Sequence, residues 1–306
     1  MLAFVPFDPA ELVDVPEGID VEYVDATESW PESAAECEFY VPSYRFARRV
    51  VEVLPDMPTL RAVQTLTAGY EHVLPYLPDH VTLCNAAGVH DAATSELAVG
   101  LMIASQRRLA DLVRAQGRRV WDQQMSSSLA DRRVLVIGAG NIGNAISRRL
   151  EGFECQVTMV GRSGRSGVRA IGDLPRLLPE AEIVVLIVPL SEETAGLVDS
   201  WFLSQLPDGA LVVNVARGPI VSTDDLLSEL ESGRLRAALD VTDPEPLPEG
   251  HRLWEAPGLL LTPHVGGASS AMWPRSHALV SRQLQRIGAG EPLLHVVRGS
   301  DHIATM

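Results

Sequence analysis

An apolar segment that runs straight into three closely spaced glycines constrains the fold of this chain more than any other feature. Residues 134–137 (Val-Leu-Val-Ile) predict a buried parallel strand, and Gly138, Gly140 and Gly143 follow before a helix-forming stretch at 144–150. A strand, a glycine turn and a helix start together bind the pyrophosphate of a dinucleotide. The glycines permit the turn, the approach of the phosphates and close helix packing, and the helix N-terminus adds N–H groups and partial positive charge. The stretch therefore predicts a dinucleotide-binding domain.

Apolar strands and amphipathic helices alternate from one end of the chain to the other, which indicates an α/β class with parallel sheets. In the first part of the chain we expect strands at 2–5, 21–24, 38–41, 60–65 and 81–85. In the second part we expect six strands, at 134–137, 156–160, 183–188, 210–215, 236–240 and 259–262. Helices are expected between the strands, among them 44–53, 91–108, 223–232 and 269–287. Six strands in this order match a complete doubly wound dinucleotide fold.

The last helix is expected to return the chain to the first domain, which is then discontinuous. We predict two doubly wound parallel-sheet domains: a flavodoxin-like substrate domain formed by 1–97 and 281–306, and a Rossmann dinucleotide-binding domain, 98–280, inserted in it. Within the inserted domain, 107–130 is polar and arginine-rich and carries Trp121. This stretch predicts a dimerisation arm, in which Trp121 either packs in the interface of a homodimer or reaches the ligand site of the neighbouring subunit.

The composition excludes several classes of chemistry and partner. All 25 basic residues are arginine, so Schiff-base chemistry on lysine and lysine general bases are ruled out. The formal net charge of −15 disfavours non-specific nucleic-acid binding and attraction to anionic membranes. Cys37, Cys84 and Cys155 have no spacing typical of a disulfide framework or a metal site, so no metal is expected. No apolar stretch is long enough for a membrane span or a signal peptide, which leads us to expect a cytoplasmic protein.

The end of the second strand of the dinucleotide domain bears on the choice of cofactor. In NAD-binding folds an acidic residue there binds the ribose 2′-hydroxyl. Here the sequence reads Gly161-Arg162-Ser163-Gly164-Arg165, without a carboxylate. Arg162 can form a bidentate pair with a 2′-phosphate, and one or two charge-assisted hydrogen bonds would favour NADP roughly 10- to 100-fold. NADP(H) is therefore the expected cofactor, with NAD(H) as a second option. The alternative is an exposed glycine-rich loop whose arginines are incidental.

Three further motifs come at the ends of predicted strands: 213–218 (VNVARG), 238–246 (ALDVTDPEP) and 261–267 (LTPHVGG). Together they provide a fixed cation, a general acid and a carboxylate that tunes the acid, which are the groups that reduction of a 2-oxo acid requires. With the glycine turn and the segments 64–73 (QTLTAGYEHV) and 85–97 (NAAGVHDAATSEL), these motifs resemble the D-2-hydroxyacid dehydrogenase family over nearly the whole chain.

The resemblance implies a role for the polar residue of each motif. The arginine that matches Arg217 binds the substrate carboxylate and polarises the carbonyl. The histidine that matches His264 exchanges a proton with the carbonyl oxygen, and the glutamate that matches Glu245 keeps that histidine protonated. Imidazole suits the task because its ordinary pKa lies near neutral pH, and a buried carboxylate partner is expected to raise it. Arg217, Glu245 and His264 are therefore the predicted catalytic residues.

The resemblance also implies the contacts to both ligands. The loop at Ala68 and Gly69 offers backbone N–H groups to the substrate carboxylate, and Asp240 contacts the nicotinamide carboxamide. His90 stands where the family often has asparagine, so it either affects substrate choice or only makes a contact at the start of a helix. The predicted substrate-binding residues are Ala68, Gly69, His90 and Arg217. The predicted cofactor-binding residues are Gly138, Gly140, Asn141, Ile142, Gly143, Arg162, Ser163, Arg165, Val188, Pro189, Thr194, Val215, Ala216 and Asp240.

Within the family the chain is nearest in type to glyoxylate and hydroxypyruvate reductases, which implies the reduction of small 2-oxo acids. Glu245 disfavours a formate dehydrogenase, which has glutamine there, and a chain without lysine lacks the loop lysine of phosphite dehydrogenases. A bulkier 2-oxo acid stays open, because Arg45 could accept a second anionic group. A nucleotide-sensing scaffold of the corepressor type also stays open, because such proteins keep the same catalytic residues.

Overall fold

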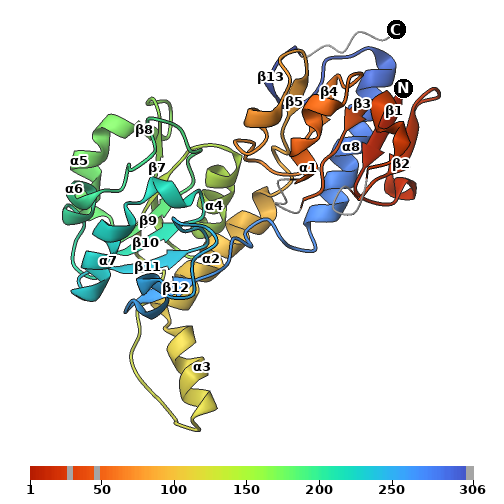
Figure 1. Cartoon of the computed structure of the whole chain (residues 1–306). Coiled ribbons are helices and arrows are strands. Elements are labelled where there is room, and N and C mark those ends of the chain that lie inside the picture. The colour runs from red at the N-terminus through yellow and green to blue at the C-terminus, as the bar shows by residue number, and fades with distance from the viewer. Residues whose placement is uncertain (26–29, 45–48, 301–306) are drawn as a thin grey trace. The chain divides into compact units, whose positions relative to one another are not determined.

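The computed structural model describes residues 1–25, 30–44 and 49–300, and the chain separates into two compact units (Figure 1). Unit 1 consists of 1–90 and 270–306, and unit 2 of 91–269. The chain begins unit 1, forms the whole of unit 2 and then returns, so unit 2 is an insertion in unit 1. The limits of the two units lie beside long helices, whereas the sequence-based limits at 97/98 and 280/281 lie inside those helices and stay predictions.

Unit 1 contains a six-stranded sheet in the order β13-β5-β4-β3-β1-β2. All neighbouring strands are parallel except β13, which runs antiparallel to β5. Without β13 this is the flavodoxin-like strand order. The strands are β1 (Leu2–Val5), β2 (Asp20–Tyr23), β3 (Cys37–Tyr40), β4 (Ala62–Gln64), β5 (Thr82–Cys84) and β13 (Val296–Arg298).

Apolar residues cover both faces of this sheet, because successive side chains of a strand point to opposite faces. Ala3 and Val5 pack with Val280 and Leu284 of helix α8, while Phe4 belongs to the apolar cluster on the opposite face. The helices of the unit are α1 (Arg49–Glu52), α8 (Met272–Ala289) and the 3-10 helices η1 (Pro9–Glu11), η2 (Glu32–Glu36), η3 (Leu54–Asp56) and η4 (Leu74–Tyr76).

Unit 2 contains a seven-stranded, fully parallel sheet in the order β12-β11-β10-β9-β6-β7-β8. The strands are β6 (Arg133–Ile137), β7 (Gln156–Gly161), β8 (Val168–Ala170), β9 (Ile183–Leu186), β10 (Leu211–Asn214), β11 (Arg236–Leu239) and β12 (Leu259–Leu261). The helices are α2 (Asp91–Gln106), α3 (Leu109–Gly117), α4 (Asn141–Glu151), α5 (Leu174–Leu177), α6 (Ser200–Ser204) and α7 (Thr223–Glu231), with the 3-10 helices η5 (Ile171–Asp173), η6 (Leu178–Glu180), η7 (Gly218–Ile220) and η8 (Arg252–Glu255).

Helices cover both faces of this sheet, as its continuous apolar strands require. Val134 and Val136 of β6 pack with residues of α2 and α4. Leu135 and Ile137, which point the other way, pack with residues of α5, α6 and α7. The chain leaves β6 toward β7 on one side and later adds β9 on the other side. This reversal of strand order is where ligands bind in doubly wound sheets, at the carboxyl ends of the strands (Figure 1).

Some elements differ from those expected from the sequence. Strands β8 and β13 were not predicted; each has only three residues and lies at the edge of its sheet, so neither leaves a readable apolar pattern. Of the helix predicted at 44–53, the described part is helical only over Arg49–Glu52. The arm includes the regular helix α3.

Within the described part of the chain, no helix is both long and apolar enough to cross a membrane.

Candidate active site

The glycine turn joins β6 to α4 at the point where the strand order reverses. Gly138 has a φ of +121°, and a Cβ there would lie 2.3 Å from the carbonyl oxygen of Ile187. A Cβ on Gly143 would lie 1.8 Å from the carbonyl oxygen of Gly138. By contrast, nothing lies within 4 Å of a Cβ built on Gly140, the N-cap of α4. The open space at Gly140 and the first turn of α4, where 141–142 follow without a side-chain cap, fit a pyrophosphate.

The loop after β7 carries the predicted phosphate-binding arginines. Arg162, Ser163 and Arg165 are exposed and follow Gly161, the last residue of β7. The guanidinium of Arg165 donates a hydrogen bond of 2.7 Å to the carbonyl oxygen of Ala139, which belongs to the glycine turn. The cationic loop is therefore hydrogen-bonded directly to the glycine turn.

Apart from Asp240, which follows β11, the other predicted cofactor residues lie in the loops after β9 and β10. Val188 and Pro189 follow β9, and the hydroxyl of Thr194 donates to the carbonyl oxygen of Pro189 at 2.6 Å. Val215 and Ala216 follow β10 and are buried. These residues thus lie after the two strands that continue the sheet beside β6.

Arg217 lies in a turn that Asn214, the last residue of β10, holds in shape. The Asn214 amide donates to the carbonyl oxygen of Arg217 at 2.9 Å and accepts from the N–H of Ala216 at 3.0 Å. The Arg217 guanidinium in turn donates to the Ala216 carbonyl oxygen at 2.6 Å. A Cβ on the next residue, Gly218, would lie 1.9 Å from the carbonyl oxygen of Thr242. The close approach at Gly218 brings the turn after β10 against the turn after β11.

His264 and Glu245 form a pair at this edge of the sheet. His264 Nδ1 lies 2.5 Å from Glu245 Oε1. The backbone of His264 is in the left-handed region, with a φ of +52°. The loop that carries Glu245 contains cis peptide bonds before Pro244 and Pro246. The carboxylate is partly exposed rather than buried, since 39% of its side chain and 26% of that of His264 are accessible.

The surroundings of Glu245 favour its ionised form. Burial by itself raises the pKa of the carboxyl group, but the hydrogen bond and charge of His264, a backbone hydrogen bond at Thr242 and the charge of Arg217 together lower it below its ordinary value. An ionised Glu245 accepts a hydrogen bond from His264 Nδ1 and leaves Nε2 as the second nitrogen of the ring. The three predicted catalytic side chains are thus electrostatically connected within unit 2.

Asp240 holds the loop that presents His264. The residue is 3% exposed. Its carboxylate accepts hydrogen bonds from the Thr262 hydroxyl at 2.5 Å, the Val265 N–H at 2.9 Å and the Gly266 N–H at 2.8 Å. Its carbonyl oxygen accepts the backbone N–H of His264 at 2.7 Å. Asp240, predicted as a cofactor contact, therefore also fixes the backbone on both sides of His264.

In unit 1, the loop 66–69 follows β4 and contains the predicted carboxylate-binding residues. Its four carbonyl oxygens each accept a hydrogen bond from a side chain: Leu66 from His90 Nε2 at 2.6 Å, Thr67 from Thr65 Oγ1 at 2.9 Å, Ala68 from Asn85 Nδ2 at 2.8 Å and Gly69 from Thr67 Oγ1 at 2.6 Å. Among the described residues, no acceptor binds the N–H groups of Ala68 and Gly69. A loop with bound carbonyls and available N–H groups is suited to an anion.

His90 is buried, with 5% of its surface exposed. Its ring lies 5.5 Å from the ring of Tyr44, centroid to centroid. Because the Leu66 carbonyl oxygen can only accept a hydrogen bond, Nε2 of His90 carries the hydrogen. Arg45, which the sequence suggested as a second anion-binding group, lies outside the described residues.

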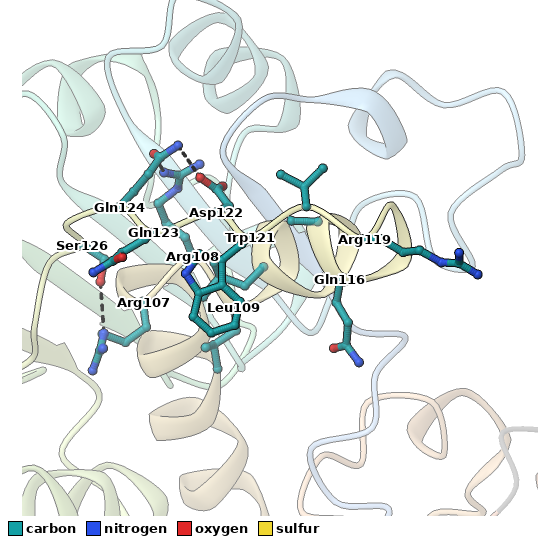
Figure 2. Close-up of a pocket in the computed structure, with 13 residues that line it drawn as sticks. Arg107, Arg108, Leu109, Gln116, Arg119, Trp121, Asp122, Gln123, Gln124 and Ser126 are labelled. Carbon is teal, nitrogen blue, oxygen red and sulfur yellow. Dashed lines mark hydrogen bonds between the residues drawn. The ribbon is translucent and has the colours of Figure 1, made fainter.

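The arm projects from unit 2 as helix α3 and a returning segment, 120–126 (Figure 1). Figure 2 shows side chains from both parts around a hollow of about 730 Å³. Trp121 is 92% exposed and Met125 96% exposed. The Arg107 guanidinium donates to the Ser126 hydroxyl at 3.1 Å across the base of the arm. The arm thus presents apolar side chains that its own unit does not cover.

Comparison with known proteins shows the family of the chain. Residues 99–266 match the family model described as D-isomer specific 2-hydroxyacid dehydrogenase, NAD binding domain. The chain belongs to the D-isomer specific 2-hydroxyacid dehydrogenases. It is an NAD(P)-dependent oxidoreductase that acts on 2-hydroxy acids, and its inserted unit is the family's NAD-binding domain.

Several relatives of this 2-hydroxyacid dehydrogenase carry more specific names. A glyoxylate reductase/hydroxypyruvate reductase of Mus musculus is 32% identical over 74% of this chain and 74% of its own. A glyoxylate reductase of Thermofilum pendens is 30% identical over 78% of this chain and 75% of its own. Among solved structures, an NADPH-dependent glyoxylate/hydroxypyruvate reductase of Sinorhizobium meliloti in complex with NADP and sulfate has a TM-score of 0.79 and 26% identity, over 97% of both chains. A D-isomer specific 2-hydroxyacid dehydrogenase of Xanthobacter autotrophicus in complex with NADPH and MES has a TM-score of 0.77 and 29% identity, again over 97% of both chains.

Sequence reasoning did not find the residues that hold the two loops. Thr65 and Asn85 bind carbonyl oxygens of loop 66–69, and Thr262 binds Asp240. The only signal in the sequence is that each is a polar residue directly after a predicted strand or at its end. Such positions are common in α/β proteins, so this signal does not single them out.

Proposed function

We propose that this dehydrogenase reduces small 2-oxo acids, such as glyoxylate or hydroxypyruvate, to 2-hydroxy acids with NADPH. The observation that carries the proposal is the His264–Glu245 pair, with 2.5 Å between Nδ1 and Oε1, and the nearby charge of Arg217. A general acid held by a carboxylate beside a guanidinium matches a substrate with adjacent carbonyl and carboxylate groups.

Each of these side chains has one task in the proposed reaction. Arg217 binds the substrate carboxylate and polarises the carbonyl group. His264 donates the proton on Nε2 to the carbonyl oxygen, while Glu245 accepts the hydrogen bond from Nδ1 and stabilises the imidazolium. The bound cofactor supplies a hydride to carbon 2. In the direction of oxidation, His264 takes the proton back from the hydroxyl group.

The cofactor preference is proposed from the loop after β7. Arg162 and Arg165 lie where an NAD-specific domain has a carboxylate, and Arg165 is tied to the glycine turn through Ala139. Two guanidinium groups favour a 2′-phosphate over a 2′-hydroxyl. The relatives named as NADPH-dependent or solved with NADPH support the same choice. The names of the relatives also support glyoxylate and hydroxypyruvate as substrates.

Initial rates with a panel of 2-oxo acids test this function. NADPH and NADH oxidation are followed in parallel with glyoxylate, hydroxypyruvate, pyruvate and phenylpyruvate. We expect turnover on glyoxylate or hydroxypyruvate, with kcat/KM about 10- to 100-fold higher for NADPH than for NADH. The His264→Ala variant should lose about 10²- to 10⁴-fold in kcat, whereas His251→Ala, a histidine of the same unit outside the proposed site, should not.

Other outcomes would redirect or contradict the proposal. A preference for phenylpyruvate would leave the proposed mechanism unchanged and indicate that the substrate is a bulkier 2-oxo acid. Full activity of His264→Ala would contradict the proposed proton donor. Tight NADPH binding without turnover of any acid would favour a nucleotide-sensing scaffold instead.

We also propose that the enzyme is a homodimer that uses the arm as its interface. The support is the exposure of Trp121 and Met125 together with Val113, which is 66% exposed, on one projecting element. Sedimentation equilibrium tests the proposal. Trp121→Ser should weaken the dimer, and Trp201→Ser, an exposed tryptophan on α6, serves as the matched control. A native protein that stays monomeric at micromolar concentration would contradict it.

A further inference from the structure

The loop 66–69 is held by hydrogen bonds to its carbonyl groups as well as by the buried side chain of Leu66. Leu66 and Ala68 are two residues apart in this loop. The Leu66 carbonyl oxygen accepts a hydrogen bond from His90 at 2.6 Å, and the Ala68 carbonyl oxygen accepts one from Asn85 at 2.8 Å. Both donors lie in the segment that follows β5, so one stretch of chain fixes the neighbouring loop at two points. The Thr67 carbonyl between them also accepts the N–H of Ala86, at 2.9 Å.

The two donors are themselves fixed. His90 is 5% exposed, and its ring lies 5.5 Å from that of Tyr44. Asn85 accepts the N–H of Ala87 on its side-chain oxygen at 3.2 Å, which orients the amide so that its nitrogen faces Ala68. Its own carbonyl oxygen accepts Gln64 Nε2 at 3.0 Å. Neither donor can turn away from the loop without breaking a second contact.

Bound carbonyl groups determine where the N–H groups point. In a planar trans peptide unit the carbonyl and N–H groups point in opposite directions, so a carbonyl drawn inward turns the N–H of the same peptide outward. The Ala68 carbonyl shares its peptide unit with the N–H of Gly69, and the Leu66 carbonyl shares its unit with the N–H of Thr67. The inward hydrogen bonds therefore present N–H groups to an anion.

We propose that His90 and Asn85 are positioning residues that orient the N–H groups of the carboxylate-binding loop of this enzyme. The inference rests on the proposed function, in which this loop binds the carboxylate of a 2-oxo acid. It assigns His90 to the loop and not to direct contact with the substrate. The recognised group is a carboxylate, and a neutral amide in its place would gain little from outward N–H groups.

Substitutions of His90 test the inference in the full-length enzyme with NADPH. His90→Phe keeps an aromatic ring beside Tyr44 and removes the donor, whereas His90→Gln keeps an N–H donor near the position of Nε2. The measured quantities are KM, kcat and the ratio of kcat/KM for a 2-oxo acid to that for its 2-oxo amide. We expect His90→Phe to raise KM about 10-fold and to lower the acid-to-amide ratio about 10-fold, equivalent to ~1.4 kcal/mol. His90→Gln should stay within about threefold of the native enzyme, a difference below ~1 kcal/mol.

Controls separate positioning from general damage. His80→Phe makes the same change at an exposed histidine of unit 1 and should leave all values unchanged. The dissociation constant of NADPH should be unchanged in every variant, because the predicted cofactor residues lie in unit 2. Asn85→Asp removes the other donor at the same size and should lower the acid-to-amide ratio as well, so the test stands even where His90→Phe does not fold.

A binding measurement distinguishes failure of this inference from failure of the proposed function. Calorimetric titration of the NADP⁺-loaded protein with oxalate reports carboxylate binding without turnover. Oxalate binding that is about 10-fold weaker in His90→Phe supports the inference even if no 2-oxo acid is reduced. An unchanged acid-to-amide ratio and unchanged oxalate affinity in both His90→Phe and Asn85→Asp would overturn it.

Discussion

Glu245 illustrates how one charged residue depends on its neighbours. The carboxylate is 39% exposed, so solvent screens it and its ion pair alone contributes little to stability. Its Oε1 faces Nδ1 of His264, and in the proposed reaction the other ring nitrogen, Nε2, exchanges the proton with the substrate. A residue of this kind matters more for the orientation and charge of the acid than for holding the fold together.

The lowered pKa of Glu245 leads to a pH-dependent prediction. The folded pKa lies below the unfolded value, so the stabilisation from the pair is fully present above about pH 4.5 and is lost as the pH falls through the lowered folded pKa. We expect the difference in Tm between the native enzyme and Glu245→Gln to shrink as the pH falls from about 5 to about 3, because the Glu245 carboxylate is protonated there.

Thermal unfolding followed by circular dichroism across this range provides the measurement. Glu249→Gln, a substitution at an exposed glutamate a few residues along the same loop, controls for the loss of one negative charge. A difference between native and Glu245→Gln that grows toward acid pH would contradict the sign of the shift.

At the scale of elements, the turn between β6 and α4 contains glycines that are required for two different reasons. Gly143 is required by the protein itself, because its Cβ would lie 1.8 Å from the carbonyl oxygen of Gly138. Gly140 has no such neighbour within 4 Å and has an ordinary φ of −84°. Packing within the protein therefore does not require glycine at 140, and we propose that the cofactor phosphates approach the backbone there.

This difference predicts opposite behaviour for two alanine variants. Gly143→Ala should lower the free energy of unfolding by about 1–3 kcal/mol, because the backbone of the turn must shift. Gly140→Ala should leave stability within about 0.5 kcal/mol of native and still weaken NADPH binding about 10-fold or more, ~1.4 kcal/mol. Urea unfolding and fluorescence titration with NADPH measure the two effects. Normal NADPH affinity in Gly140→Ala would show that the phosphates do not approach this residue.

The sequence could predict elements whose pattern is local and strong. The apolar runs of β6, β9 and β10 are buried on both faces, and the glycine turn follows directly from steric rules. It could not predict β8 and β13, which are three-residue edge strands with half-exposed positions. Nor could it predict the contacts to loop 66–69, because a side chain that binds the backbone of a distant residue leaves no regular spacing.

For the whole molecule, the predicted contacts of the two ligands are distributed differently over the two units. All predicted cofactor residues and the three predicted catalytic side chains lie within 91–269, whereas the loop 66–69 and both of its donors lie within 1–90. A ligand stabilises the conformation that it binds, by about 2.7 kcal/mol at a concentration 100 times its dissociation constant. Cofactor and substrate should therefore protect different segments from amide hydrogen exchange.

Hydrogen exchange with mass spectrometry can measure this division. Saturating NADPH should slow exchange in the glycine turn and in the first turn of α4 and leave loop 66–69 unchanged. Oxalate added to the NADP⁺ complex should then slow exchange at the N–H groups of 67–69, for which the described residues provide no acceptor. Arg217→Ala should weaken this protection without changing that of the glycine turn. Protection of loop 66–69 by NADPH alone would mean that the cofactor orders both units, and the carboxylate would then bind a loop that is already fixed. Protection by oxalate alone would mean that the substrate itself completes the site.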